Sequence, residues 1–184
     1  MNYQMLVNKK NPVPNNFQIN NMVDVDSNYR DDVKLEKLVN EAWIKLKKQV
    51  LLQGFIIDIE SGYRDLDYQK RILNELIKEK GEEYAYKAAA LPGYSEHNTG
   101  LALDYCIFDN NRFYIETEID GMEASKYTNS IAYQYGFIVR YPKGKEDITG
   151  YMYEPWHLRY VGEELAKYLY ENKLTLDEYY MKEN

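Results

Sequence analysis

The sequence predicts one domain of the α+β class, in which helices and strands follow one another without strict alternation. Two kinds of pattern predict this class. Long stretches with apolar residues at three-to-four spacing are typical of helices, and short apolar, β-branched runs are typical of strands. A third observation is the length of 184 residues, which fits a single domain. We therefore expect one hydrophobic core built by both kinds of element.

The N-terminal part differs from the rest in composition. Residues 1–30 are rich in Asn and Pro, so we expect an irregular arm packed on a domain that comprises residues 31–184. Pro12 and Pro14 argue against regular structure in this arm. From Asp32 we expect a helix that Gly54 ends, because apolar residues recur at helical spacing. These apolar residues are Val33, Leu35, Leu38, Val39, Ala42, Trp43, Leu46 and Val50.

The remaining elements are expected in the following order. Apolar runs predict strands at residues 55–59, 101–108, 137–141 and around 156–161. Helices are expected at about residues 66–80, ended by Gly81, and 122–135, ended by Gly136. Helical segments follow the last strand to the end of the chain, where Thr175 and Glu178 have the spacing of a capping box.

The composition excludes several classes of protein. Acidic residues outnumber basic ones by 30 to 23 and the formal net charge is −7, so we expect no nucleic-acid partner. No run of about 18 apolar residues is present to span a membrane. The opening residues lack the apolar region of a signal peptide. We expect a soluble cytoplasmic monomer, or a cell-wall or extracellular protein if an export segment has been removed.

The chain contains only two histidines, His97 and His157, which limits the kinds of metal site. A three-histidine site is impossible, so a carboxylate or Cys106 must complete any catalytic zinc site. Asp104 lies seven residues after His97. If residues 101–108 form a strand, Asp104 shares a face with Ala102 and Cys106, whose small side chains leave room for a metal and a bound water.

The second histidine lies in the segment Glu154-Pro155-Trp156-His157. In a regular strand Glu154 and His157 would face opposite sides, but Pro155 breaks that regularity, so parity does not decide their positions. Two histidines and one aspartate leave a coordination position open for water, and a nearby carboxylate can take its proton. Arg64 supplies a fixed charge suited to a terminal carboxylate or a developing oxyanion. Taken singly, each histidine is more often structural than a ligand.

Three gapped motifs follow one another along the chain. They are Ser61-Gly62-Tyr63-Arg64 with Gln69, then Ser95-x-His97-x-x-Gly100-x-Ala102-x-Asp104, and about fifty residues later Glu154-x-Trp156-His157-x-Arg159-Tyr160-Val161-Gly162. Together these motifs resemble the VanY-type D-alanyl-D-alanine carboxypeptidase family, and they are also similar to VanXY-type and LdcB-type enzymes. The likeness covers about residue 50 to the end.

The resemblance implies a zinc D,D-carboxypeptidase domain over residues 31–184, with a small antiparallel-type sheet flanked by helices and a central zinc site. It implies that His97, Asp104 and His157 hold one Zn²⁺. It also implies that Glu154 acts as the general base and that Arg64 stabilises charge on the substrate and the transition state.

The substrate implied by the resemblance is a peptidoglycan stem peptide or its precursor. Ser95 matches a position that contacts substrate, and we expect Gln69 and Tyr153 to contact it as well. Removal of the last D-Ala of a pentapeptide would deplete the target of vancomycin. An L,D-carboxypeptidase for tetrapeptides, a D,D-dipeptidase and a non-catalytic wall-binding module are the alternatives. Glu154 argues against the last of these, because a binding module needs no base.

Overall fold

A computed structural model describes residues 2–183 of the chain. Its centre is an antiparallel sheet in the order β3-β4-β7-β6, and β5 pairs with the far half of β4. The strands are β3 (Ile56–Ser61), β4 (Ala102–Asp109), β5 (Arg112–Tyr114), β6 (Phe137–Tyr141) and β7 (Glu154–Tyr160). The α+β class with an antiparallel sheet is therefore confirmed.

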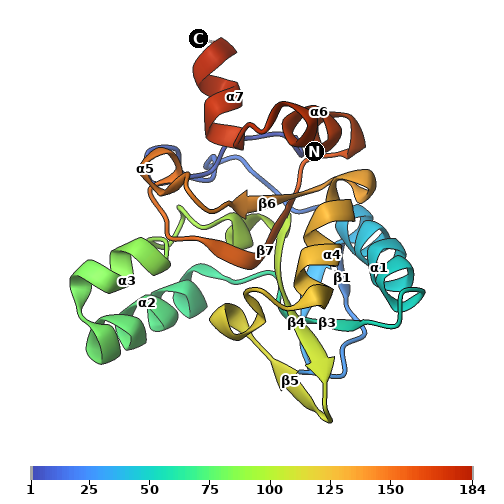
Figure 1. Ribbon diagram of the computed structural model, residues 1–184. Helices are drawn as coiled ribbons and strands as arrows, with labels where there is room; N and C mark the ends of the chain where they lie inside the picture. The colour runs from blue at the N-terminus through green and yellow to red at the C-terminus, as the bar shows by residue number, and fades with distance from the viewer. Residues whose placement is uncertain (1, 184) are drawn as a thin grey trace.

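Helices cover the sheet from several sides (Figure 1). In this view α1 and α4 lie on one side, α2 and α3 on the other, and α6 and α7 pack near β6. Their bounds are α1 (Lys37–Leu51), α2 (Leu66–Lys80), α3 (Glu82–Ala88), α4 (Glu123–Ile131), α5 (Glu146–Thr149), α6 (Glu163–Asn172) and α7 (Leu176–Glu183), and the 3-10 turns are η1 (Glu96–Thr99), η2 (Glu116–Ile119) and η3 (Ala132–Tyr135). Within residues 2–183, no helix is long and apolar enough to cross a membrane.

The start of the first helix is the main error of the sequence interpretation. The first residues of the helix expected from Asp32 form strand β2 (Lys34–Glu36) instead. This strand pairs with β1 (Met22–Asp24), which lies inside the N-terminal arm that we expected to be irregular. Val33 and Leu35 are both buried, and their spacing of two residues suits one face of a strand but not one face of a helix. The helix begins at residue 37 because the Glu36 carboxylate accepts hydrogen bonds from the backbone N–H groups of Leu38 and Val39, which caps the first turn.

The other predicted elements are confirmed with small changes. Helix α2 ends at Gly81, whose φ of 83° suits glycine, and Thr175 and Glu178 form the reciprocal capping box. The third helix is shorter than expected, since α4 gives way to the 3-10 turn η3 before Gly136. Besides β1 and β2, the sequence interpretation missed α3, α5, β5, η1 and η2.

The core lies between the sheet and α1. Trp43 and Leu46 of α1 are buried against Leu103 and Tyr105 of β4 and Leu158 of β7 in one apolar cluster. Ala102, Asp104 and Cys106 alternate with these residues along β4, point to the opposite face and are buried too. Asp104 therefore projects from a strand that is buried on both faces.

Candidate metal site and active site

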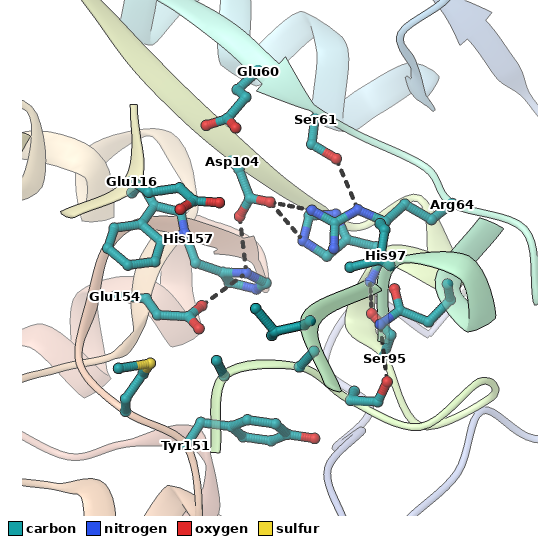
Figure 2. A pocket seen from close by; sticks show the side chains of 18 of the residues that line it. Glu60, Ser61, Arg64, Ser95, His97, Asp104, Glu116, Tyr151, Glu154 and His157 are labelled. Carbon is teal, nitrogen blue, oxygen red and sulfur yellow. Dashed lines mark hydrogen bonds and ion pairs between the residues drawn. The ribbon is translucent and has the colours of Figure 1, made fainter. Parts of the chain in front are cut away.

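Three potential metal ligands converge from three elements. His97 lies on η1, Asp104 on β4 and His157 on β7, and Asp104 and His157 are direct neighbours in the β4–β7 register. His97 Nε2 is 3.2 Å from Asp104 Oδ2, and His157 Nδ1 is 3.1 Å from Asp104 Oδ1. One ligand atom from each residue lies within 4.8 Å of the others, and all three residues are buried. Figure 2 shows the three side chains pointing toward one another.

The second nitrogen of each histidine has its own partner. His97 Nδ1 lies 2.7 Å from the backbone oxygen of Gly62, and His157 Nε2 lies 3.3 Å from Glu96 Oε2. Both partners are acceptors, so these outer nitrogens can keep their protons when His97 Nε2 and His157 Nδ1 bind a metal. Such outer partners are usual for metal-binding histidines. The residues present therefore fit a two-histidine, one-carboxylate metal site.

The metal-free site carries strongly shifted protonation equilibria. Burial, together with the charge of Arg64, lowers the pKa of His97 to about 4. Burial works to raise the pKa of Asp104, but His97 and Arg64 hold that pKa well below its usual range. Burial works to lower the pKa of His157, but hydrogen bonds to Asp104 and Glu96 raise it to about 9. Metal binding must displace this proton, so metal affinity should rise with pH.

A break in the strand register brings Glu154 to the metal ligands. Val139 pairs with Leu158 but Tyr141 pairs with Glu154, so residues 155–157 lie opposite Arg140 alone. The bulge removes the alternation that would have put Glu154 and His157 on opposite faces. Glu154 Oε2 lies 3.7 Å from His157 Nδ1.

Glu154 as a residue is only 6 % exposed, and burial of its carboxyl group favours the neutral form. Burial raises the pKa of Glu154 to about 8 in the metal-free site, although the nearby His157 charge opposes the shift. A carboxyl group whose pKa lies near neutral pH suits general acid–base chemistry.

Arg64 faces the same centre from the loop after β3. Its Nε donates to Ser61 Oγ at 2.8 Å, and its Nη2 forms an ion pair with Asp104. The backbone of Arg64 is tied to η1, because its N–H donates to the His97 oxygen and its own oxygen accepts from Asn98. The guanidinium and His97 are thus positioned as one unit.

A cavity of about 380 Å³ opens onto these residues. Ser95 and Gln69, two of the expected substrate contacts, line it. Gln69 Nε2 donates to the backbone oxygen of Ala90, which leaves its Oε1 as an acceptor. Tyr153, the third expected contact, does not line the cavity, and its hydroxyl donates to Asp120 at 3.4 Å. The reason is local, since the β7 strand carries Glu154 inward and leaves its preceding neighbour outside.

Two glutamates that the sequence interpretation missed also line the cavity. Glu60 lies at a second register break, between Ile59 and Ser61 of β3, and Glu116 begins η2. Burial and the Asp104 charge raise the pKa of Glu60 to about 8. Figure 2 shows both carboxylates beyond Asp104, on the side away from Ser95. Their positions at the cavity depend on the register break in β3 and on the turn η2, which a local sequence pattern does not reveal.

Glu96 is the other residue that sequence reasoning missed. Its Oε1 accepts from Arg140 Nε and from Arg159 Nη1, each at 2.7 Å, while its Oε2 faces His157. Both arginines are fully buried. A signal was present, because Glu96 precedes His97 and Arg159 follows His157 by two residues within the motifs. The network fixes the orientation of His157 from behind.

The same arginines join the network to both ends of the chain. Arg159 Nη2 donates to the backbone oxygens of Tyr3 and Met5 at 3.0 and 2.8 Å. Arg140 Nη1 donates to Asp177 of α7 at 2.5 Å. The N-terminal arm and the last helix therefore support the metal ligands indirectly.

Comparison with known proteins agrees with this geometry. The sequence profile of the VanY family, described as D-alanyl-D-alanine carboxypeptidase, matches residues 32–163. The chain belongs to the VanY family. It is 41% identical to the YodJ protein of Bacillus subtilis over 186 residues, which cover 98% of this chain and 68% of that protein. It is 35% identical over 188 residues to VanXYC of Enterococcus gallinarum, a bifunctional D-Ala-D-Ala dipeptidase and carboxypeptidase, with 98% and 94% covered.

Solved structures of similar proteins share the fold. The LdcB LD-carboxypeptidase has a TM-score of 0.85 and 41% identity, over 96% of this chain and 85% of that one. A mutant of the vancomycin-resistance D,D-pentapeptidase VanY, solved in complex with Zn(II), has a TM-score of 0.81 and 30% identity, over 97% and 99% of the two chains. The VanY-type resemblance found in the motifs is confirmed.

Proposed function

We propose that the chain is a zinc-dependent D,D-carboxypeptidase that removes the terminal D-Ala from peptidoglycan stem pentapeptides or their precursors. The observation that carries the proposal is the position of Glu154, buried and 3.7 Å from the ligand nitrogen of His157. A base placed beside three convergent metal ligands and open to a cavity is the arrangement that peptide hydrolysis needs.

His97 Nε2, His157 Nδ1 and a carboxylate oxygen of Asp104 would hold the zinc ion. Bound there, zinc supplies a Lewis acid that lowers the pKa of water toward about 7. The solved Zn(II) complex of the related VanY protein supports this choice of metal. Three protein ligands leave a coordination position open, as in catalytic zinc sites.

The protein's own groups then perform the proton transfers. The Glu154 carboxylate takes the proton of the attacking water and delivers it to the nitrogen of the leaving D-Ala. The Arg64 guanidinium, which forms an ion pair with Asp104, stabilises negative charge on the peptide oxygen or on the terminal carboxylate. Ser95 and Gln69, at the cavity wall, hold the peptide.

The experiment that tests the proposal is D-Ala release from a purified stem pentapeptide, with and without a chelator. Chelator-sensitive release of one D-Ala per peptide is expected. Glu154→Gln should lower kcat by at least about 100-fold while zinc stays bound, because the substitution removes the base and leaves the ligands. A Glu154→Gln variant with the wild-type rate would refute the mechanism.

Two relatives give specific grounds for proposing that a different peptide bond is cleaved. The 41% identity to LdcB favours an L,D-carboxypeptidase acting on tetrapeptides, and the VanXYC relative favours an added D,D-dipeptidase activity. Product analysis with pentapeptide, tetrapeptide and D-Ala-D-Ala separates the three activities. If the pentapeptide is the substrate, a role in vancomycin resistance follows from the loss of the terminal D-Ala.

A further inference from the structure

The bulge in β7 that carries Glu154 is held from outside the sheet. Pro155 has no N–H, so the hydrogen-bond ladder lacks a donor directly after Glu154. The carbonyl oxygen of Pro155 instead accepts a hydrogen bond from Asn129 Nδ2, at 3.0 Å. Asn129 lies on helix α4, which packs against β7. The Asn129 side chain thus forms a hydrogen bond with the backbone directly after Glu154.

The orientation of this amide is set by its second partner. Tyr105 Oη donates to Asn129 Oδ1 at 3.1 Å and lies 3.1 Å from Ser125 Oγ, which can donate to it in turn. A backbone carbonyl only accepts, so the amide nitrogen must face Pro155. Ser125, Tyr105 and Asn129 form a directional chain that ends on the bulge.

The residues at the start of this hydrogen-bond chain are buried. Tyr105 is fully buried in the central strand β4, next in sequence to the ligand Asp104, and Ser125 is 3% exposed. The hydrogen bonds therefore fix the position of the Pro155 carbonyl relative to β4, the strand that supplies the metal ligand Asp104. Small displacements of a reacting group lower catalytic rates steeply, so fixing the backbone next to Glu154 should affect the rate of the reaction.

We propose that Asn129 is a positioning residue for the reaction, which acts by holding the Pro155 carbonyl so that Glu154 stays directed at the metal ligands. The inference rests on the proposed function, since it assigns Glu154 as the base. Within residues 2–183, Asn129 makes no hydrogen bond to a metal ligand and does not line the cavity, so it acts on Glu154 through the Pro155 carbonyl.

The test uses Asn129→Leu, which keeps the volume and removes both hydrogen bonds, and Asn129→Asp, which keeps the shape but removes the donor. Both variants should lower kcat by 10- to 100-fold. KM and the zinc affinity, measured by chelator competition, should stay within threefold of wild type. Thr128→Val is the matched control, because it removes a buried hydroxyl bond to Ala124 on the same helix and should leave kcat unchanged.

A double-mutant comparison separates positioning from general loosening. In a Glu154→Gln background the base is already gone, so adding Asn129→Leu should not lower the residual rate further. The inference is overturned if Asn129→Leu keeps the wild-type kcat, if it lowers the residual rate of Glu154→Gln, or if the zinc affinity falls along with kcat. A wild-type chain that releases no D-Ala overturns the proposed function and this inference together, whereas an active wild type with an unaffected Asn129→Leu overturns this inference alone.

Discussion

Replacing Glu96 by glutamine should weaken metal binding without touching a metal ligand. When His157 binds metal through Nδ1, its Nε2 carries a proton that Glu96 Oε2 accepts, at 3.3 Å. The other oxygen of Glu96 accepts from Arg140 and Arg159. A glutamine has one oxygen and one NH₂ group. If the oxygen stays with the arginines, the NH₂ faces a second donor on His157, and the ligating tautomer is disfavoured.

The size of the effect follows from what is lost. A hydrogen bond to a charged group contributes about 1.5–3 kcal/mol. Each 1.4 kcal/mol is about tenfold in affinity, so Glu96→Gln should weaken zinc binding about 10- to 100-fold. The metal-free protein should also lose about 3–5 kcal/mol of unfolding free energy, because two fully buried arginines lose their shared anion.

Chelator competition measures the zinc affinity, and denaturant unfolding at several zinc concentrations gives the same constant by linkage if the free variant is unstable. Asp177→Asn is the matched control. Asp177 is a buried carboxylate that also accepts from Arg140, but it does not contact His157. It should lower stability and leave the zinc affinity within threefold. Equal losses of affinity in both variants, or a wild-type affinity in Glu96→Gln, would show that Glu96 does not act through His157.

Two further predictions concern stability. The pKa of His157 in the folded, metal-free protein is about 9 against an ordinary 6.5, so its stabilising contribution is complete below pH 6.5 and is lost as pH rises through 9. Denaturant unfolding of chelated protein should therefore give lower stability at pH 9.5 than at pH 6.5, and zinc-loaded protein should show a smaller difference, since its His157 is already neutral. Gly136→Ala should cost about 3 kcal/mol or more in unfolding free energy, because φ is +81° and the new Cβ would lie 2.5 Å from Tyr160 Cε2. Gly121→Ala, with φ +79° and open space, should cost only about 1 kcal/mol, and equal losses would contradict the packing argument.

The sequence by itself determined the elements with strong periodic patterns and the ligand residues. Helix α2 was expected at its observed bounds because an amphipathic run ends at Gly81, a local signal. The scarcity of histidine restricted any catalytic zinc site to two histidines completed by a carboxylate or by Cys106. The motif order supplied the family. These conclusions rest on residue identity and short-range spacing, which are fully present in the chain.

Only the tertiary structure decided how the site is assembled. Whether Glu154 reaches His157 depends on a bulge between β6 and β7, and strand parity alone would have placed them apart. The position of Glu96 depends on Arg140 of β6 and Arg159 of β7, and Tyr153 lies outside the cavity although it adjoins Glu154 in sequence. Register and long-range ion pairs are set by packing between segments far apart in the chain, so no local pattern encodes them.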